Sequence, residues 1–330
     1  MGADVDDAMT APRQIEPGRE WFITRRCAQQ EFLLRPDEEL SQIIAYCLAE
    51  AAERFRVQLI AWVVMSNHYH AVVHDTDGRL PAFLAHFHRN VAKAVNRLRG
   101  RHENMWSAEE TCVTYLPTPE DVLEKVVYVL TNPVAANLVE RAREWPGLHS
   151  IGHLDGRSTT HSRPSWYFKS TSKVMGASAS LRAVVPPRLS RTAASRWASD
   201  VKDAVARRER LLRDARVSAK KRVLGAKAVL DTRPTARPAR DKDKDKGKDK
   251  DKTKGRSETK LRPALACKNA DRRREELARI KGFRAEYARK LALWVAAKKP
   301  EERHKIVFPA GTYRLRMLGV RCAPFERPAA

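Results

Sequence analysis

The sequence predicts an α+β protein whose first structured elements follow the order βαββαβ. Apolar residues recur at 3,4 spacing in three segments that begin near residues 36, 80 and 118, which is the period of a half-buried helix. Short runs rich in branched and aromatic residues lie between them and indicate strands. This order is typical of a ferredoxin-like domain, in which an antiparallel sheet has its helices on one face. A basic, mostly helical C-terminal extension with a disordered linker is expected to follow.

Each element has its own signal in the sequence. Acidic residues after Pro36 favour the positive end of a first helix. Gly100 is a natural stop for the second helix, and Thr118 followed by a proline and an acidic residue is a helix start. This third helix is expected to break or kink before Pro133. In order, the expected elements are a strand at 20–24, a helix at 36–54, a hairpin of strands at 57–65 and 68–73, a helix at 80–98, a strand at 111–116 and a helix from 118.

Charge is distributed very unevenly along the 330 residues. The chain has 64 Lys plus Arg and 40 Asp plus Glu, a formal net charge of +24. Residues 1–200 carry 24 basic and 23 acidic side chains, whereas residues 201–330 carry 40 and 17. Such asymmetry indicates a polyanionic partner. The expected divisions are a disordered tail at 1–18, a folded domain at 19–170, a basic helical region at 171–240, a flexible Lys/Asp-rich linker at 241–260 and a basic helical region at 261–330.

Composition also excludes several classes of protein. No apolar run approaches the roughly 20 residues that cross a bilayer. The acidic stretch at 4–7 stands where a secretory signal would need basic residues. The five cysteines are widely spaced and none forms a CxxC pair, so neither a zinc ribbon nor a disulfide framework is indicated. The sequence therefore predicts a reduced, cytoplasmic, nucleoid-associated protein that binds nucleic acid.

The triplet His68-Tyr69-His70 is the first candidate site. Side chains alternate along a strand, so the two histidines project from one face about 7 Å apart and can bind one divalent cation. Two partly exposed histidines without a ligand are the simpler interpretation of the spacing. His74 shares that face and is a possible further ligand, although a lone histidine is more often a surface residue.

Tyr128 and a row of basic residues are the other candidates. Tyr128 lies at the edge of an apolar helix stripe, where a tyrosine is either a boundary residue or a nucleophile; a phenol of pKa near 10 attacks phosphorus only with metal or base assistance. Arg89, Lys93 and Arg97 recur at helical spacing after His86 without an acidic neighbour. The basic row is either a solvated face or a phosphate-binding surface.

Two segments resemble a known family. Residues 61–70 are similar to the MxNHxH segment of the single-tyrosine HUH transposases, which include the IS200-like and the REP-associated tyrosine transposases. Residues 128–139 resemble their YxxxNPVxAxLV segment, and the similarity covers about residues 20–150. The two motifs occur in the same order, on an element order that also fits.

The resemblance implies a function and a mechanism. Such enzymes cut single-stranded DNA, often near a hairpin, and the tyrosine forms a 5′-phosphotyrosine that a 3′-OH later reverses. By this resemblance Tyr128 is the nucleophile, and His68 and His70 hold Mg²⁺ or Mn²⁺ with a further polar ligand. Some relatives carry that ligand just before the first histidine, but here Val63, Val64 and Met65 are apolar, so the third ligand is unassigned.

Alternatives remain open at this point. One is a domesticated nuclease that uses the same chemistry on REP-type hairpins. Another is a non-catalytic protein that binds single-stranded DNA or RNA through the same scaffold. A homodimer is possible, and the sequence does not say whether the tyrosine acts on the histidines of its own subunit or of a partner.

Overall fold

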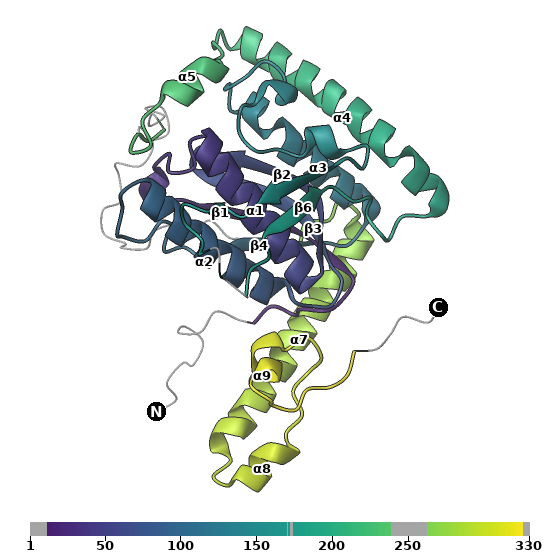
Figure 1. The fold of residues 1–330 in the computed structure, drawn as a ribbon. Coiled ribbons are helices and arrows are strands. Elements are labelled where there is room, and N and C mark those ends of the chain that lie inside the picture. The colour runs from purple at the N-terminus through teal and green to yellow at the C-terminus, as the bar shows by residue number, and fades with distance from the viewer. Residues whose placement is uncertain (1–11, 170, 172–173, 239–262, 326–330) are drawn as a thin grey trace, which may run out of the picture.

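A computed structural model describes residues 12–169, 171, 174–238 and 263–325 of the chain. At its centre lies a four-stranded antiparallel sheet with the strand order β2-β3-β1-β4. Two helices make the connections: α1 (Glu38–Phe55) joins β1 to β2, and α2 (Leu80–Leu98) joins β3 to β4. This order and connectivity confirm the predicted ferredoxin-like α+β fold (Figure 1). The strands are β1 (Arg19–Arg26), β2 (Val57–Met65), β3 (His68–Asp75) and β4 (Cys112–Leu116).

Helices α1 and α2 cover one face of the sheet, as the sequence predicts. The carboxylate of Asp37 caps α1 by accepting a hydrogen bond from the Leu40 amide at 2.9 Å. Asp75, at the end of β3, accepts from the amides of Arg79 and Leu80 at 2.8 and 2.9 Å and so fixes the start of α2. The core between this layer and the sheet includes Ile43, Tyr46, Cys47, Phe83, Phe87 and Val91 from the helices and Trp21, Ile23, Tyr69 and Ala71 from the strands.

The opposite face of the sheet has its own helical layer, formed by α3 (Pro119–Ala135) and α4 (Arg191–Ser218). Helix α3 packs on β2 and β3, and α4 packs on the outside of α3 (Figure 1). Trp197, Val201 and Val205 of α4 recur every four residues and are buried against α3. The sheet is therefore enclosed by helices on both faces, and the second layer comes from residues outside the βαββαβ unit.

Helix α3 does not break before Pro133, contrary to our expectation. It runs on to Ala135, and Pro133 is buried inside it. Because Pro133 lies in the last turn, its missing amide removes few helical hydrogen bonds. The chain leaves the helix after Ala135, and Asn137, two residues on, adopts a left-handed φ of 55°. The amide of Leu138 reaches the Pro133 carbonyl at 3.0 Å, and that of Asn137 reaches the Val134 carbonyl, the bonding pattern of a Schellman cap.

A second, two-stranded sheet crosses the boundary that we placed at residue 170. Strands β5 (Ser158–Ser162) and β6 (Ser178–Arg182) pair antiparallel and pack on α1. The Tyr46 hydroxyl donates to the Gly176 carbonyl at 2.6 Å, and Leu181 is fully buried. The region expected to be basic and helical from 171 thus begins with a strand, and its helices are α4 and α5 (Ala226–Asp231). Strand β6 is mostly serine, alanine and arginine, and its short alternation escaped the sequence analysis.

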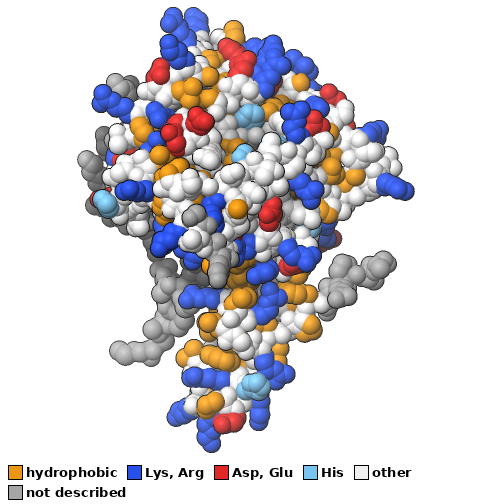
Figure 2. All heavy atoms as spheres, viewed as in Figure 1, with side chains coloured by type: hydrophobic (Ala, Val, Ile, Leu, Met, Phe, Trp, Pro, Cys, Tyr) orange, Lys and Arg blue, Asp and Glu red, His pale blue; other side chains and the backbone are white. Residues whose placement is uncertain are grey.

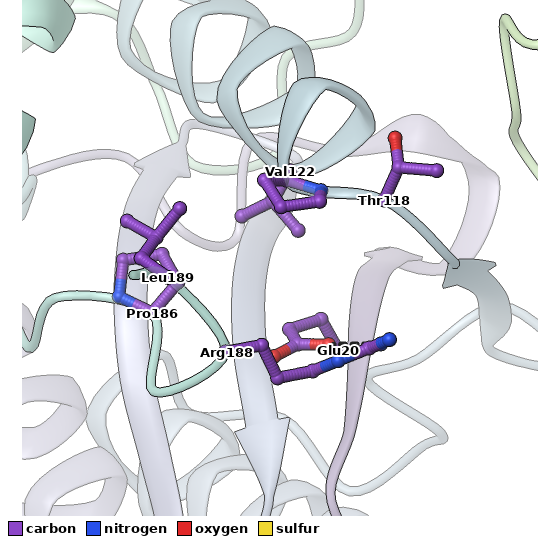
Figure 3. A pocket seen from close by; sticks show the side chains of 7 residues that line it. Glu20, Thr118, Val122, Pro186, Arg188 and Leu189 are labelled. Carbon is purple, nitrogen blue, oxygen red and sulfur yellow. Dashed lines mark hydrogen bonds and ion pairs between the residues drawn. The ribbon is translucent and has the colours of Figure 1, made fainter. Parts of the chain in front are cut away.

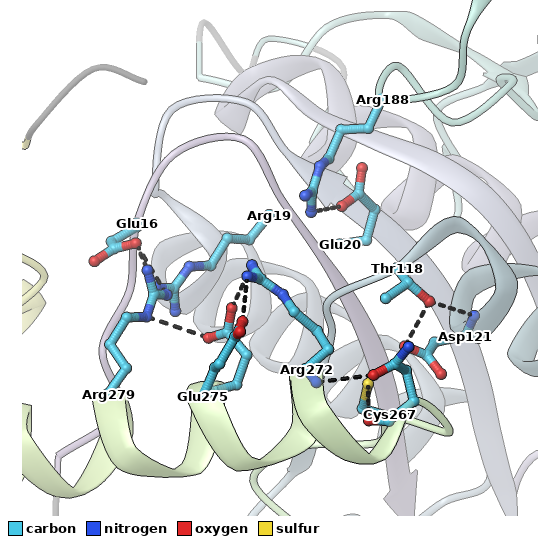
Figure 4. A network of polar contacts seen from close by, with 12 residues as sticks. Glu16, Arg19, Glu20, Thr118, Asp121, Arg188, Cys267, Arg272, Glu275 and Arg279 are labelled. Carbon is cyan, nitrogen blue, oxygen red and sulfur yellow. Dashed lines mark hydrogen bonds and ion pairs between the residues drawn. The ribbon is translucent and has the colours of Figure 1, made fainter. Parts of the chain in front are cut away.

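Residues 264–266, near the start of the C-terminal part of the chain, pair with the edge strand β4 of the main sheet. The Tyr115 amide of β4 donates to the Ala264 carbonyl, and the Ala266 amide donates to the Tyr115 carbonyl, both at 3.0 Å. The chain then forms α7 (Ala270–Ala296), α8 (Pro300–Lys305) and α9 (Tyr313–Met317), which project as an arm (Figure 1). Arg272 and Arg279 pair with carboxylates within α7, and Arg279 also pairs with Glu16, which links the helix to the segment before β1 (Figure 4). The Lys/Asp-rich stretch at 241–260 lies outside the described residues.

Part of the expected N-terminal tail is packed rather than free. Residues 1–11 lie outside the described residues, but residues 12–18 lie on the body of the protein. Ile15 is buried, and its amide donates to the Gly311 carbonyl at 3.0 Å. Burial of the apolar Ile15 side chain stabilises this segment, which explains why ordered structure begins before β1. Within the described part of the chain, no helix is long and apolar enough to span a membrane.

Candidate active site

His68 and His70 are the first and third residues of β3, next to the turn that follows β2. Both side chains project from the sheet face that α3 covers. Their ring centroids lie 4.7 Å apart with 77° between the ring planes. The predicted common face is thus confirmed. Tyr69 points to the other face, where its hydroxyl lies 2.6 Å from Nε2 of His88 on α2.

The two imidazoles differ in their hydrogen bonds. Nδ1 of His68 lies 2.7 Å from Oδ1 of Asn67. The side chain of Asn132 lies close enough to His68 to raise the pKa of its imidazole, against the larger effect of burial. His70 is only 5% exposed, and neither of its ring nitrogens has a hydrogen-bond partner among the described residues. A buried polar atom without a partner is costly, so His70 is suited to bind a group that enters the site from outside the chain.

Both histidines are held in their neutral form. Burial, with a smaller contribution from the charge of Arg26, lowers the pKa of His68 from 6.5 to about 4. Burial also lowers the pKa of His70 well below its usual value, and the charges of His68 and Arg26 act in the same direction. The imidazoles are therefore unprotonated at neutral pH, which is the state that binds a metal ion.

Tyr128 lies directly beside this pair. Its ring meets the ring of His70 edge-on, with 5.4 Å between the centroids, and meets Phe22 of β1 at 5.8 Å. The side chain is 43% exposed, so it remains accessible from solvent. Nζ of Lys125, one helical turn earlier on α3, lies 5.8 Å from the centroid of the Tyr128 ring. The fold therefore brings together, from one chain, the three residues predicted as the catalytic set.

Asn132 belongs to the same site, although the sequence analysis did not assign it a role. It follows Tyr128 by four residues and so lies on the same side of α3, facing His68. No group of three His, Cys, Asp or Glu side chains capable of holding a metal ion occurs among the described residues. An amide oxygen is outside that set of ligand types, and the side chain of Asn132 brings one close to His68. The spacing from Tyr128 was the signal that could have identified it.

His74, the possible further ligand, is already engaged. Its Nδ1 lies 3.1 Å from Oε1 of Glu20, and the other oxygen of Glu20 accepts from Arg188 at 3.0 Å (Figure 3). Four residues of strand place it about 13 Å from His70. Its imidazole therefore serves this buried polar cluster rather than the histidine pair.

The basic row on α2 lies on the opposite face of the sheet from Tyr128. Arg89, Lys93 and Arg97 are exposed, as predicted, but they project from the layer formed by α1 and α2. His86 is not part of that exposed row, because it is buried and its Nε2 lies 2.7 Å from Oε2 of Glu50 on α1. The structure thus separates this basic row from the histidine pair.

Comparisons with known proteins give structural likeness only. No family model matches the chain. No curated protein matches it either. A structure of a REP-associated tyrosine transposase bound to a REP hairpin is 20% identical, with a TM-score of 0.38 over 46% of this chain and 87% of that one. A putative transposase from Deinococcus radiodurans R1 is 18% identical, with a TM-score of 0.27 over 38% of this chain and 97% of that one.

Proposed function

We propose that the chain is a DNA transposase, a single-strand DNA endonuclease and ligase that uses Tyr128 as its nucleophile. The observation that carries the proposal is the placement of Tyr128 against His70, a buried imidazole with two unpartnered nitrogens. The resemblance of residues 61–70 and 128–139 to the two motifs of the single-tyrosine HUH transposases supports the same conclusion. Single-stranded DNA that contains a hairpin is the proposed substrate.

The proposed reaction is a transesterification at one phosphodiester. The Tyr128 hydroxyl loses its proton and its oxygen bonds to phosphorus, while the bond from phosphorus to the 3′ oxygen breaks. The 5′ phosphate of the downstream strand is then esterified to Tyr128, and the upstream strand leaves with a free 3′-OH after gaining a proton. Attack by another 3′-OH reverses the step and joins two strands without an external energy source.

The side chains beside Tyr128 fit a divalent cation. His68 and His70 are neutral, the nitrogens of His70 have no other partner, and Asn132 supplies an amide oxygen next to His68. We propose that these three residues hold Mg²⁺ or Mn²⁺, of which Mn²⁺ tolerates imidazole better. When bound, the metal would polarise the scissile phosphate. Asn67 orients the His68 ring through its 2.7 Å contact with Nδ1.

A covalent-capture experiment tests the proposal. Single-stranded hairpin oligonucleotides are incubated with the protein and Mg²⁺ or Mn²⁺, and the products are resolved under denaturing conditions. A label at the 3′ end of the DNA should move with the protein, whereas a label at the 5′ end should appear in a shorter free strand. Tyr128→Phe should abolish both products, because it removes the attacking oxygen and keeps the ring.

Tyr287→Phe is the matched control, since Tyr287 lies on α7 and contacts Phe283 and Phe308 through its ring. It should form the adduct at the wild-type level. An adduct that persists in Tyr128→Phe would place the nucleophile elsewhere. If the wild type binds these oligonucleotides but forms no adduct with either metal, the protein is a binding module.

A further inference from the structure

A row of side chains on β1 continues the site beyond the two histidines. Phe22, Thr24 and Arg26 project from the same sheet face as His68 and His70, because β1 and β3 pair with Thr24 opposite His70 and Arg26 opposite His68. The ring of Phe22 stacks on His70 with 5.4 Å between centroids. The row is only partly covered, and exposure increases from Phe22 to Arg26. Arg26 therefore lies at the exposed end of this row, opposite His68.

Arg26 differs from the other arginines of β1 in having neither a hydrogen-bond nor an ion-pair partner for its side chain among the described residues. Arg19 pairs with Glu16, and Arg25 lies 2.7 Å from Nδ1 of His88 on the other face of the sheet. Arg26 is exposed, and no described carboxylate forms an ion pair with it. Its charge lies close enough to lower the pKa of both site histidines. A fixed positive charge beside the site serves no ion pair within the described protein and is open to an anion.

A second cation, Lys125, lies beside Tyr128 itself. Nζ of Lys125 lies 5.8 Å from the Tyr128 centroid and 6.0 Å from that of Phe22. The same Nζ lies 3.6 Å from Oε1 of Glu124. The other oxygen of Glu124 lies 2.9 Å from Nζ of Lys268. Two cations thus flank the tyrosine and the histidine pair, an arrangement that favours an anion at the point where the Tyr128 oxygen would attack.

We propose that Arg26 is a catalytic residue that binds a non-bridging oxygen of the scissile phosphate. The inference rests on the proposed function, and it assigns a role to a residue outside the two sequence motifs. The planar guanidinium presents paired N–H donors that match a phosphate, and it stays charged throughout the reaction. As Tyr128 attacks, negative charge grows on the non-bridging oxygens, and a donor already in place stabilises that charge.

A binding experiment tests the phosphate contact without any chemistry. Affinity for a hairpin oligonucleotide is measured in the Tyr128→Phe background, in EDTA, over a series of salt concentrations. Loss of one phosphate contact on single-stranded DNA should lower the slope of log affinity against log salt by about 0.7. Arg26→Ala should show this loss, and Arg26→Lys should keep most of the slope. Arg182→Ala, an exposed arginine on β6 beyond the α1 layer, is the matched control and should leave the slope unchanged.

A kinetic experiment tests the catalytic role. Adduct formation is followed in a single turnover with saturating DNA, where differences in affinity no longer matter. Arg26→Ala should slow the step about 100-fold, as expected for loss of one charge-stabilising donor, and Arg26→Lys about 10-fold. Arg182→Ala should react at the wild-type rate. Arg26→Gln provides a second neutral variant if Arg26→Ala fails to fold.

The outcomes separate this inference from the proposed function. If the wild type forms the adduct and both neutral variants form it equally fast, Arg26 is not catalytic although the function stands. An unchanged salt slope in Arg26→Ala would show that Arg26 does not contact a phosphate. If the wild type forms no adduct, the proposed function fails, and the catalytic role of Arg26 fails with it.

Discussion

The ring of Tyr128 stands edge-on to the imidazole of His70, with 5.4 Å between their centroids and 71° between their planes. The two residues are 58 positions apart in the sequence, on α3 and β3 of the same chain. The contact aligns the exposed tyrosine with a buried imidazole whose nitrogens have no described partner. One copy of the chain is thus sufficient to assemble the tyrosine and both histidines in this arrangement.

His68→Ala should abolish the covalent adduct and leave the fold intact. His68 is only half-buried at the start of β3, and its polar neighbours among the described residues are Asn67 and Asn132, so few packing interactions are lost. Adduct formation with Mn²⁺ and thermal melting measure the two effects. His304→Ala, on the exposed helix α8, should behave as wild type. Full activity of the wild type in EDTA would contradict the metal assignment.

Stability of the metal-free protein should fall as the pH drops from about 6.5 toward 4. The pKa of His68 is about 4 in the folded chain and near 6.5 when unfolded. The unfolded chain therefore binds the proton first, so this contribution to stability is complete above pH 6.5 and is lost as the pH falls. The loss from His68 alone is about 2 kcal/mol at pH 5. Urea unfolding at pH 7 and pH 5 measures it, and His68→Ala should be less sensitive to pH; equal sensitivity would assign the effect to other groups.

Asn132→Ala should reduce adduct formation about 100-fold at limiting Mn²⁺, because it removes the proposed oxygen ligand. Asn132→Asp restores an oxygen ligand and should recover most of the activity. Metal titrations of both variants, read out as adduct formed per turnover, separate weaker metal binding from a slower reaction. The assignment fails if Asn132→Ala reacts with the same metal dependence as the wild type.

Much of the fold follows from local sequence signals. The β2–β3 hairpin, the caps at Asp37 and Thr118 and the periodic apolar faces of α1 and α2 each depend on residues close in the chain. The second helical layer does not, because the partners of Trp197 on α4 are residues of α3 that are distant in the sequence. The pairing of Tyr115 with residues 264–266 also joins segments that are distant in the sequence, and no local pattern predicts it.

The candidate site was predictable in part for a similar reason. His68 and His70 share a face because strands alternate, and Tyr128 was identified by a motif. Asn132 could be assigned to the site only from the position of α3 over β3. Arg26 could be assigned to it only from the register of β1 against β3. Neither is a property of one segment, so the contribution of these residues to the site became visible only in the folded chain.

Replacing Arg89, Lys93 and Arg97 with glutamine should weaken DNA binding without changing the chemistry. The three side chains lie on α2, across the sheet from Tyr128, so they can contact only DNA that extends around the domain. If all three bind single-stranded phosphates, the salt slope should fall by about 2. The single-turnover rate at saturating DNA should stay at the wild-type value. An unchanged slope would identify the row as a solvated helix face.

The basic region after residue 200 should contribute DNA affinity, but deletion is a poor way to test it. A chain that ended near residue 200 would lose Val201 and Val205, which pack against the helix that carries Tyr128. We expect such a truncation to lower the melting temperature and the adduct yield together. Figure 2 shows Lys and Arg side chains gathered over α4, where Arg207, Arg208 and Arg210 are exposed.

Substituting these three α4 arginines with glutamine removes charge and keeps the packing of Trp197, Val201 and Val205. Loss of three phosphate contacts should make the salt dependence of hairpin binding shallower by about 2, with the melting temperature unchanged. Because the exposed α4 surface lies outside the Tyr128 site, adduct formation at saturating DNA should keep its wild-type rate. Fluorescence anisotropy at several salt concentrations, beside single-turnover capture, measures both effects. A slower chemical step in this variant would mean that α4 acts on the position of Tyr128 as well as on DNA affinity.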